Sequence, residues 1–193
     1  MAKKISSRTP ESVRIIGGKW RSRQLKFPSV DGLRPTGSRI RETLFNWLAP
    51  YIEGASCLDL FAGSGALCFE ALSRGAKNCT AVENNRVATA QLIDNKTLLA
   101  ADDLRIIATD TRDFLSANKQ NRQFDIIFLD PPFECQLHTE IARLLSDSDW
   151  LADNALIYCE LPAMESFSQP ANWHLLKDKI AGKVRFCLFS YVE

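Results

Sequence analysis

The sequence predicts an α/β protein with a mostly parallel, seven-stranded sheet that finishes in an antiparallel edge hairpin. From residue 56 onward, short apolar runs alternate with helical stretches of 8 to 15 residues. This alternation is typical of βαβ units, whose parallel sheet is covered on both faces. The segment 173–192 breaks the rhythm with two β-rich runs around Gly182. The length of 193 residues fits one domain with a modest extension.

We divide the chain into an N-terminal extension, residues 1–50, and a catalytic domain, residues 51–193. Residues 1–12 are polar and lack periodicity. The segment 13–27 predicts a small β-hairpin that turns at Gly17-Gly18. A polar link follows, and Ser38 is the predicted N-cap of an amphipathic helix that extends to Tyr51. The extension is therefore expected to consist of one hairpin and one helix.

The domain is expected to alternate strands and helices up to its last hairpin. The predicted strands are 57–61, 79–83, 104–108, 124–129 and 155–159, and the predicted helices are 66–73, 86–100 and 137–145. Residues 173–180 and 184–192 predict the two strands of the final hairpin. We find no internal repeat or low-complexity segment.

Charge is distributed unevenly along the chain. Residues 1–50 carry 11 Lys and Arg against 3 Asp and Glu, whereas residues 51–193 carry 13 against 20. A basic arm on an acidic body suggests that the arm meets a polyanion. Six cysteines without a C-x-x-C pair predict reduced core residues of a cytoplasmic protein, and two histidines without ligand spacing argue against a zinc site. Neither a signal peptide nor a run of membrane-spanning length is apparent.

The tetrapeptide Asp130-Pro131-Pro132-Phe133 directly follows the apolar run 124–129. Proline fixes φ and lacks an N–H donor, and the residue before it is kept extended, so the chain leaves the strand stiff. A carboxylate, adjacent carbonyl groups and an aromatic face then meet at one point, which suits a planar base with an exocyclic amine. The alternative is an ordinary Pro-Pro turn whose Phe133 belongs to the core.

A glycine-containing turn, residues 59–65, joins the first predicted strand to the first helix. Gly63 and Gly65 permit a tight turn and the close approach of a ligand. Glu83 ends the second strand, where an acid can accept hydrogen bonds from the hydroxyl groups of a ribose. With Asp59 and Asp110, and with the acid of the tetrapeptide, it is expected to line one crevice at the carboxyl ends of the strands.

The crevice fits S-adenosylmethionine better than a dinucleotide. A G-x-G-x-x-G pattern would place its third glycine at position 68, which is Cys68. Asp59 would repel a diphosphate, whereas it suits an ammonium group. S-adenosylmethionine carries an ammonium and a sulfonium group. Each acid taken alone could instead be a strand-end cap.

Together, the glycine turn, the acid of the second strand and the Asp-Pro-Pro-Phe element resemble the Rossmann-like class I methyltransferases that modify exocyclic amines of bases. Three further segments, 14–21, 34–36 and 39–48, resemble the bacterial RsmD family of 16S ribosomal RNA guanine-N2 methyltransferases. The resemblance covers nearly the whole chain. It implies S-adenosylmethionine as donor and a guanine of the 30S subunit or an assembly intermediate as substrate. We expect a monomer that needs neither metal nor membrane.

This interpretation assigns a role to each candidate residue. Asp59 is expected to hold the amino-acid end of the donor, Glu83 its ribose and Asp110 its adenine amine. The other predicted cofactor-binding residues are Phe61, Ala62, Gly63, Gly65, Asn84 and Thr111. The predicted catalytic residues are Asp130, Pro131, Pro132 and Phe133. They would orient the N2 amine of a guanine turned out of its RNA context, with the acid and the Pro131 carbonyl as acceptors.

The basic extension supplies the predicted RNA-binding residues, which are Arg14, Lys19, Trp20, Arg21, Arg23, Lys26, Arg34 and Arg39. Phosphate contacts from such side chains give salt-dependent affinity with little sequence information. Arg34 and Arg39, with Arg41, could instead border the cofactor mouth.

Two other functions stay open at this point. One is a DNA adenine-N6 or cytosine-N4 methyltransferase, although no separate DNA-recognition domain is apparent. The other is a non-catalytic RNA-binding assembly factor, against which the intact Asp130 and Glu83 argue.

Overall fold

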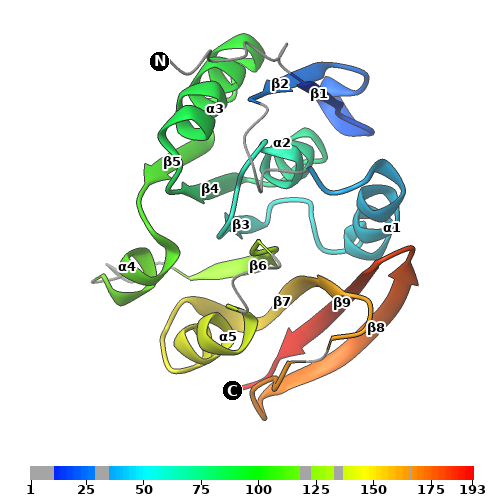
Figure 1. Cartoon of the computed structure of the whole chain (residues 1–193), viewed down its shortest axis with the longest axis vertical. Helices are drawn as coiled ribbons and strands as arrows, with labels where there is room; N and C mark the ends of the chain where they lie inside the picture. The colour runs from blue at the N-terminus through cyan, green and yellow to red at the C-terminus, as the bar shows by residue number, and fades with distance from the viewer. Residues whose placement is uncertain (1–10, 29–34, 118–122, 133–136, 166) are drawn as a thin grey trace, which may run out of the picture.

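The computed structural model describes residues 11–28, 35–117, 123–132, 137–165 and 167–193. In these ranges it contains a two-stranded sheet and a seven-stranded sheet, the latter in the order β5-β4-β3-β6-β7-β9-β8 (Figure 1). The strands β3 to β7 pair in parallel, and β9 pairs antiparallel with both β7 and β8. The predicted fold class, including its antiparallel edge, is therefore confirmed.

The large sheet and its helices follow the predicted order. Their bounds are β3 Ser56–Asp59, α2 Ala66–Ser73, β4 Asn78–Glu83, α3 Arg86–Leu99, β5 Leu104–Ala108, α4 Thr111–Ser116, β6 Phe124–Leu129, α5 His138–Ser146, β7 Leu151–Pro162, β8 Trp173–Ala181 and β9 Val184–Tyr191. The sequence did not predict α4, because six residues are too few to show a helical period. Strand β7 is longer than predicted at both ends.

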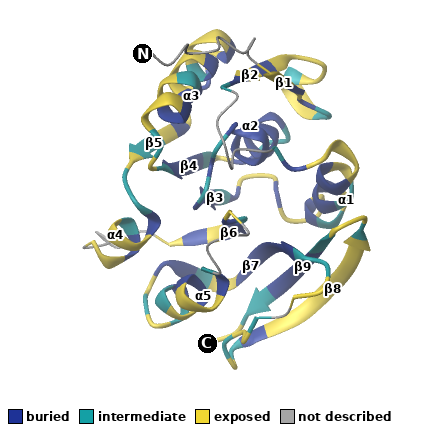
Figure 2. Cartoon of the chain, in the orientation of Figure 1, coloured by how far each residue is buried: buried dark blue, intermediate teal, exposed yellow. Residues whose placement is uncertain are grey.

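Helices cover both faces of the large sheet. On one face, α1 (Ser38–Leu48), α2 and α3 pack over apolar side chains such as Cys57, Phe128 and Tyr158. On the other face, α4 and α5 cover residues that alternate with these, such as Leu58 and Ile127. Figure 2 shows the central strands buried, whereas β8 at the edge is mostly exposed. The central strands are therefore covered on both faces, which fixes the position of their carboxyl ends.

The N-terminal hairpin differs from its prediction. Its strands are only β1 (Glu11–Arg14) and β2 (Gln24–Phe27), and a 3-10 turn, Gly18–Trp20, lies between them. The prediction of a tight Gly17-Gly18 turn was wrong because this connection docks on α2. A Cβ on Gly18 would lie 1.7 Å from the Ser73 carbonyl oxygen, so the close approach requires glycine.

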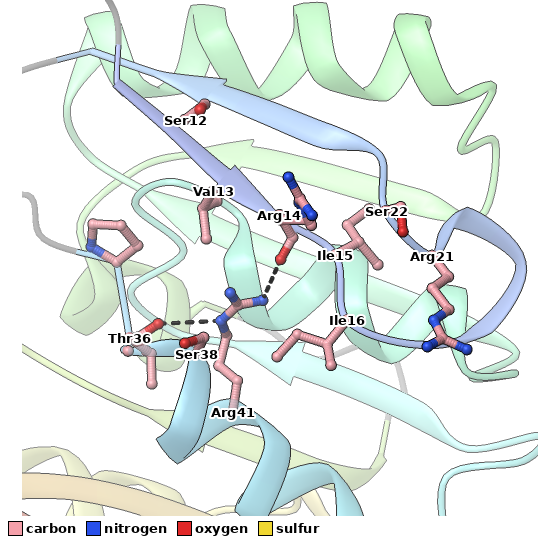
Figure 3. A pocket seen from close by; sticks show the side chains of 12 residues that line it. Ser12, Val13, Arg14, Ile15, Ile16, Arg21, Ser22, Thr36, Ser38 and Arg41 are labelled. Carbon is pink, nitrogen blue, oxygen red and sulfur yellow. Dashed lines mark hydrogen bonds between the residues drawn. The ribbon is translucent and has the colours of Figure 1, made fainter.

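Buried polar groups fasten the hairpin to the domain. The Glu70 carboxylate on α2 accepts hydrogen bonds from the Ile16 and Gly17 N–H groups, each at 2.8 Å. It also pairs with Arg41 at 3.4 Å and with Arg74 at 2.7 Å. Arg41 in turn donates to the carbonyl groups of Arg14 and Thr36, as Figure 3 shows.

The opposite strand of the hairpin is held by one amide side chain of α3. Asn95 accepts from the Lys26 N–H and donates to the Lys26 carbonyl at 2.7 Å. Apolar residues of the hairpin, such as Ile15 and Leu25, belong to the same hydrophobic core as α1 and α2. The extension is therefore packed on the domain as part of one folded body.

Candidate active site

The predicted acids lie along neighbouring strand ends. Asp59 ends β3 and Glu83 ends β4, while Asp130 directly follows β6 and Asp110 lies two residues beyond β5. These four strands are adjacent in the order β5-β4-β3-β6. From β3 the chain first adds β4 and β5 on one side, and then crosses over to add β6 on the other side of β3. Such a switch point is where open α/β sheets bind ligands. The structure therefore brings together the acids that the sequence predicted.

Asp59 is an under-satisfied buried acid. The side chain is 2% exposed, and its Oδ2 atom has no hydrogen-bond partner among the described residues. Burial raises the pKa of Asp59 to about 7, with a smaller contribution from the charge of Glu83, although backbone hydrogen bonds lower it. A buried carboxylate oxygen without a donor fits a cationic ligand such as an ammonium group.

Glu83 closes the glycine turn over the end of β3. Its two carboxylate oxygens accept from the N–H groups of Gly63 and Asn85, each at 2.7 Å. Gly63 and Gly65 both have positive φ values, 51° and 78°, and a Cβ on Gly65 would lie 2.6 Å from the Phe69 ring. The turn thus needs glycine, and its hydrogen bonds fix the Glu83 carboxylate at the carboxyl ends of β3 and β4. Carboxylate oxygens can accept further hydrogen bonds.

The other predicted cofactor-binding residues surround this turn. Asp110 is the N-cap of α4 and accepts from the Arg112 N–H at 2.9 Å through Oδ1. Thr111 is buried, and its hydroxyl donates to the Leu60 carbonyl at 2.6 Å, which ties α4 to the end of β3. Asn84 is exposed beyond β4. The turn itself contains Phe61, which is half-buried, and Ala62, which is buried.

The Asp-Pro-Pro segment forms the next part of the rim. Asp130 is half-buried, Pro131 is buried and Pro132 is exposed. The Thr36 hydroxyl donates to Asp130 Oδ2 at 3.2 Å, which links the acid to the loop before α1. Burial raises the pKa of Asp130 well above its usual range, and the charges of Glu160 and Asp59 add to this rise. Phe133, the predicted stacking residue, lies outside the described residues.

Glu160 is a candidate functional residue that the sequence reasoning missed. It lies in β7, is 4% exposed, and accepts a hydrogen bond from the Tyr158 hydroxyl at 2.7 Å. Burial raises the pKa of Glu160, while hydrogen bonds from Tyr158 and Thr36 lower it. An acid inside the apolar run 155–161 was the available signal, because such a residue is rarely buried without a role.

Most of the predicted RNA-binding residues are exposed on the hairpin side of the molecule. Exposed side chains are those of Arg14, Lys19, Arg21, Arg23, Lys26 and Arg39. Trp20 is half-buried, with its ring 6.4 Å from that of Phe69, and the Lys19 ammonium lies 4.5 Å from the Trp20 ring centre. Arg34 lies outside the described residues. Arg41 is buried and joins the loop before α1 to the hairpin through the carbonyl groups of Thr36 and Arg14.

A cavity of about 500 Å³ separates the hairpin from the start of α1 (Figure 3). The exposed arginines Arg14 and Arg21 line it from the hairpin, and the buried Arg41 side chain extends into it from α1 toward the hairpin. Thr36 also lines the cavity while its hydroxyl contacts Asp130. The cavity therefore adjoins the Asp-Pro-Pro segment.

No group of three or more His, Cys, Asp or Glu side chains in the described ranges could hold a metal ion. No helix within these ranges is long and apolar enough to cross a membrane. His138 is buried with one ring nitrogen 2.6 Å from the Glu160 carbonyl oxygen, and burial lowers its pKa. The described cysteines are buried and free.

The doubly covered sheet, the glycine turn and the acids at the strand ends define a Rossmann-like methyltransferase. Comparisons with known proteins agree. The chain is 48% identical over 179 residues to Ribosomal RNA small subunit methyltransferase D of Escherichia coli K12, covering 92% of this chain and 89% of that protein. Residues 13–190 match the family model described as Conserved hypothetical protein 95. The chain belongs to this family, and the resemblance to the RsmD family is confirmed.

Solved structures give the same classification. A putative methyltransferase from Escherichia coli superposes with a TM-score of 0.83 at 48% identity, covering 94% of this chain and 99% of that one. A putative SAM-dependent methyltransferase from Streptococcus mutans has a TM-score of 0.72 at 18% identity, covering 95% and 56%. The second likeness shows the fold alone. The predicted enzyme class, a methyltransferase, is confirmed.

Proposed function

We propose that this chain transfers a methyl group from S-adenosylmethionine to the exocyclic N2 amine of one guanine in 16S ribosomal RNA. We further propose that it acts as a monomer on 30S subunits or their assembly intermediates. The names of its relatives, ribosomal RNA small subunit methyltransferases, support the class of substrate. The observation that carries the proposal is that two features lie on the adjacent strands β3 and β6. One is the Asp59 oxygen that has no hydrogen-bond partner among the described residues, and the other is the Asp-Pro-Pro segment.

The crevice residues fit S-adenosylmethionine. Asp59 would hold the ammonium group with its free oxygen, and Glu83 the ribose hydroxyl groups. Asp110 would accept from the adenine amine, beside Asn84 and the turn Phe61–Gly65, while Thr111 keeps α4 against β3. When bound, the donor supplies a methyl group on a sulfonium, which is a good leaving group. The protein therefore needs to contribute mainly orientation, worth ~7–11 kcal/mol in favourable cases.

The acceptor amine is expected at the end of β6. Asp130 and the Pro131 carbonyl would accept the two N2 hydrogens of the guanine, with Pro132 stiffening the rim and Phe133 stacking on the base. The lone pair of N2 would then point toward the donor side, where Asp59 lies on the neighbouring strand. The base must leave its RNA context to reach this position.

The hairpin is proposed to bind the RNA backbone. Its exposed cations are Arg14, Lys19, Arg21, Arg23 and Lys26, and Arg39 is exposed at the start of α1. The cavity between hairpin and α1 leads from Arg14 and Arg21 to Thr36, which contacts Asp130. A strand held on the hairpin could therefore place one base at the Asp-Pro-Pro turn. Trp20 and Arg34 complete the proposed RNA-binding set.

Transfer of radiolabelled methyl groups tests the function directly. Purified protein is given labelled S-adenosylmethionine with 30S subunits, naked 16S RNA or DNA, using particles from cells that lack the gene. We expect label in 30S particles, and nuclease digestion should release it as N2-methylguanosine. Label in DNA alone, or in N6-methyladenine, would contradict the proposal.

A further inference from the structure

Half-buried Asp130, directly after β6, and buried Glu160, inside β7, lie on neighbouring strands. These strands pair in parallel, and the register places Leu129 opposite Cys159. Asp130 and Glu160 are the next residues of each strand. The Thr36 hydroxyl donates its single proton to Asp130 Oδ2 at 3.2 Å, and it lies close enough to Glu160 to stabilise the charged form of that acid instead. The donor and acceptor sites described above make no use of Glu160.

We propose that Glu160, acting through Thr36, is a positioning residue that sets the protonation of Asp130 for methyl transfer to the guanine amine. This inference rests on the proposed function, because it assigns the pair a task at the acceptor base. Asp130 contacts the amine. Glu160 does not contact the amine and acts on Asp130 from the neighbouring strand β7. Two carboxyl groups that interact strongly titrate as a pair and keep one proton between them over a range of pH.

The surroundings of the pair favour such sharing. Burial raises the pKa of both acids, and the charges of Glu160 and of Asp59 on β3 raise the pKa of Asp130 further. Tyr158 donates to Glu160 from β7, and Thr36 donates to Asp130 from the loop before α1.

Within the described ranges, the side-chain hydrogen bonds to these two carboxylates come from hydroxyl groups, and neither carboxylate forms an ion pair. Two ionisable groups on other elements contact backbone atoms beside the pair. His138 on α5 contacts the Glu160 carbonyl, and Arg41 on α1 donates to the Thr36 carbonyl. No cationic side chain therefore offsets the repulsion at Asp130 in the described ranges, and protonation of one of the two acids relieves it.

This sharing matters when the amine reacts. The N2 lone pair forms the bond to the methyl carbon while the carbon–sulfur bond breaks, which leaves a positive charge on nitrogen. One N–H bond then breaks, its electrons stay on nitrogen, and its proton passes to the Asp130 carboxylate. For this step the shared proton must reside on Glu160 and leave Asp130 ionised. A carboxylate that is disfavoured as an anion binds the incoming proton more strongly.

A purely structural role for Glu160 makes a different prediction. If it only anchored Tyr158, its replacement would loosen β7 without a defined effect on Asp130. If it sets the protonation of Asp130, loss of its charge must lower the titration midpoint of Asp130. Loss of the Thr36 hydroxyl, which stabilises the charged form, must raise that midpoint. The opposite signs separate the two roles.

Carbon-13 NMR of side-chain carboxyl groups in the free protein measures the midpoint. Asp130→Asn assigns the signal, and the variants are Glu160→Gln and Thr36→Val. The exposed Glu165→Gln serves as control, because it removes one negative charge five residues further along the same segment. We expect Glu160→Gln to lower the Asp130 midpoint by about one pH unit or more. Thr36→Val should raise it, and the control should leave it unchanged.

The pH dependence of methyl transfer gives the matching readout. The acid limb of kcat should move to lower pH in Glu160→Gln and to higher pH in Thr36→Val, with KM for the donor unchanged. A folded Glu160→Gln variant with an unmoved Asp130 midpoint would overturn the inference. If that variant does not fold, an unmoved midpoint in Thr36→Val overturns it instead. The NMR titration needs no RNA, so it is independent of a failure to methylate 30S subunits.

Discussion

Two sets of buried acids in this molecule have opposite surroundings. Under the hairpin, the Glu70 carboxylate receives two backbone N–H donors and two arginine side chains at 2.7–3.4 Å. At the rim of the sheet, Asp59 has one oxygen without a partner, and Asp130 receives only the Thr36 hydroxyl at 3.2 Å among its side-chain hydrogen bonds in the described ranges. The same chemical group is fully satisfied within α2 and under-satisfied at the strand ends.

The difference shows which region serves folding and which serves chemistry. A buried carboxylate with all its donors in place stabilises a fixed arrangement, and removal of either partner leaves an uncompensated charge. A buried carboxylate without donors costs stability and is retained where a ligand completes it. Glu70 therefore fastens the hairpin, whereas Asp59 and Asp130 gain their missing hydrogen-bond donors only when the methyl donor and the acceptor amine bind. The predictions below test this division.

The largest effect is expected from Asp130→Ala. Methyl transfer should fall by about 10²–10⁴-fold or more, since both orientation and the proton acceptor are lost. Donor affinity should stay within a few-fold, because this carboxylate faces the acceptor base. The free energy of unfolding should not fall, because a buried acid repelled by Glu160 and Asp59 is removed. A transfer assay, calorimetry and urea denaturation on one preparation check all three.

Exposed Asp113 on α4 offers a matched control for that experiment. Asp113→Ala removes the same group without touching the rim, so its turnover should equal that of the unmodified protein. Near-normal turnover in Asp130→Ala would contradict the orienting role and would make this acid a strand-end cap.

Glu70→Gln should produce the largest loss of stability. It leaves buried Arg41 without its carboxylate partner, and breaking such a pair costs about 3–5 kcal/mol. Urea denaturation measures this loss. Hydrogen exchange should show that the amides of residues 11–27 lose protection first. Exposed Glu140→Gln should cost little, because its ion pair with Arg112 is on the surface. Equal protection of the hairpin in both variants would show that Glu70 does not fasten it.

The sequence predicted the acid rim better than the anchor, and physical reasons explain the difference. Asp59, Glu83 and Asp130 each follow an apolar run, and parallel strands bring such ends together whatever their exact bounds. Glu70 lies inside a helix whose every residue is buried, and apart from Arg74 its partners are 29 to 54 positions away. No local pattern reports such a contact.

The same reasoning explains the errors in the hairpin and at β7. Gly17-Gly18 resembles a hairpin turn, but here the glycines allow the backbone to approach α2. Glu160 was missed because its significance depends on pairing with β6, which places it beside Asp130. A single sequence does not show which residues of distant strands become neighbours in the sheet.

Glu83→Ala is expected to weaken donor binding by ~1.5–3 kcal/mol, the scale of hydrogen bonds to a charged acceptor. The loss includes the ribose contacts and the anchoring of the glycine turn through Gly63. Calorimetry with S-adenosylmethionine measures it. Asp94→Ala, an exposed acid on α3, should leave the dissociation constant unchanged. Equal affinities for the two variants would mean that Glu83 only caps the turn.

Donor binding should also depend on pH through Asp59. Its pKa in the free protein is raised to about 7, so the acid is largely protonated at pH 6 and ionised at pH 8. An ammonium group binds the ionised form, which lowers the pKa and releases a proton. Affinity should therefore rise about tenfold from pH 6 to pH 8 and level off above.

Calorimetry in buffers of different ionisation enthalpy counts the released proton. Asp59→Asn should bind the donor more weakly and lose this pH dependence. A flat profile in the unmodified protein would place the ammonium group away from Asp59.

The smallest effect at any one salt concentration is expected on the hairpin. Arg21, Arg23 and Lys26 are exposed, and the hairpin is anchored mainly by Glu70 and Asn95, since the one side-chain contact that these three make with α3 in the described ranges is an exposed 3.4 Å hydrogen bond from Arg23 to the Leu98 carbonyl. The triple replacement by Ala should therefore keep the fold and donor affinity. Binding to 30S particles should weaken, and the slope of log affinity against log salt should fall by ~2 or more, at roughly 0.7–0.9 per lost phosphate contact.

A control triple variant carries Ala at Lys177, Lys179 and Lys183, which are exposed on and beside β8 at the other end of the molecule. It removes the same charge, so a change in slope due to net charge alone would appear in both variants. A slope that changes only in the hairpin variant assigns the phosphate contacts to that surface. If both slopes equal that of the unmodified protein, the hairpin does not touch the RNA backbone, and its cations serve solubility alone.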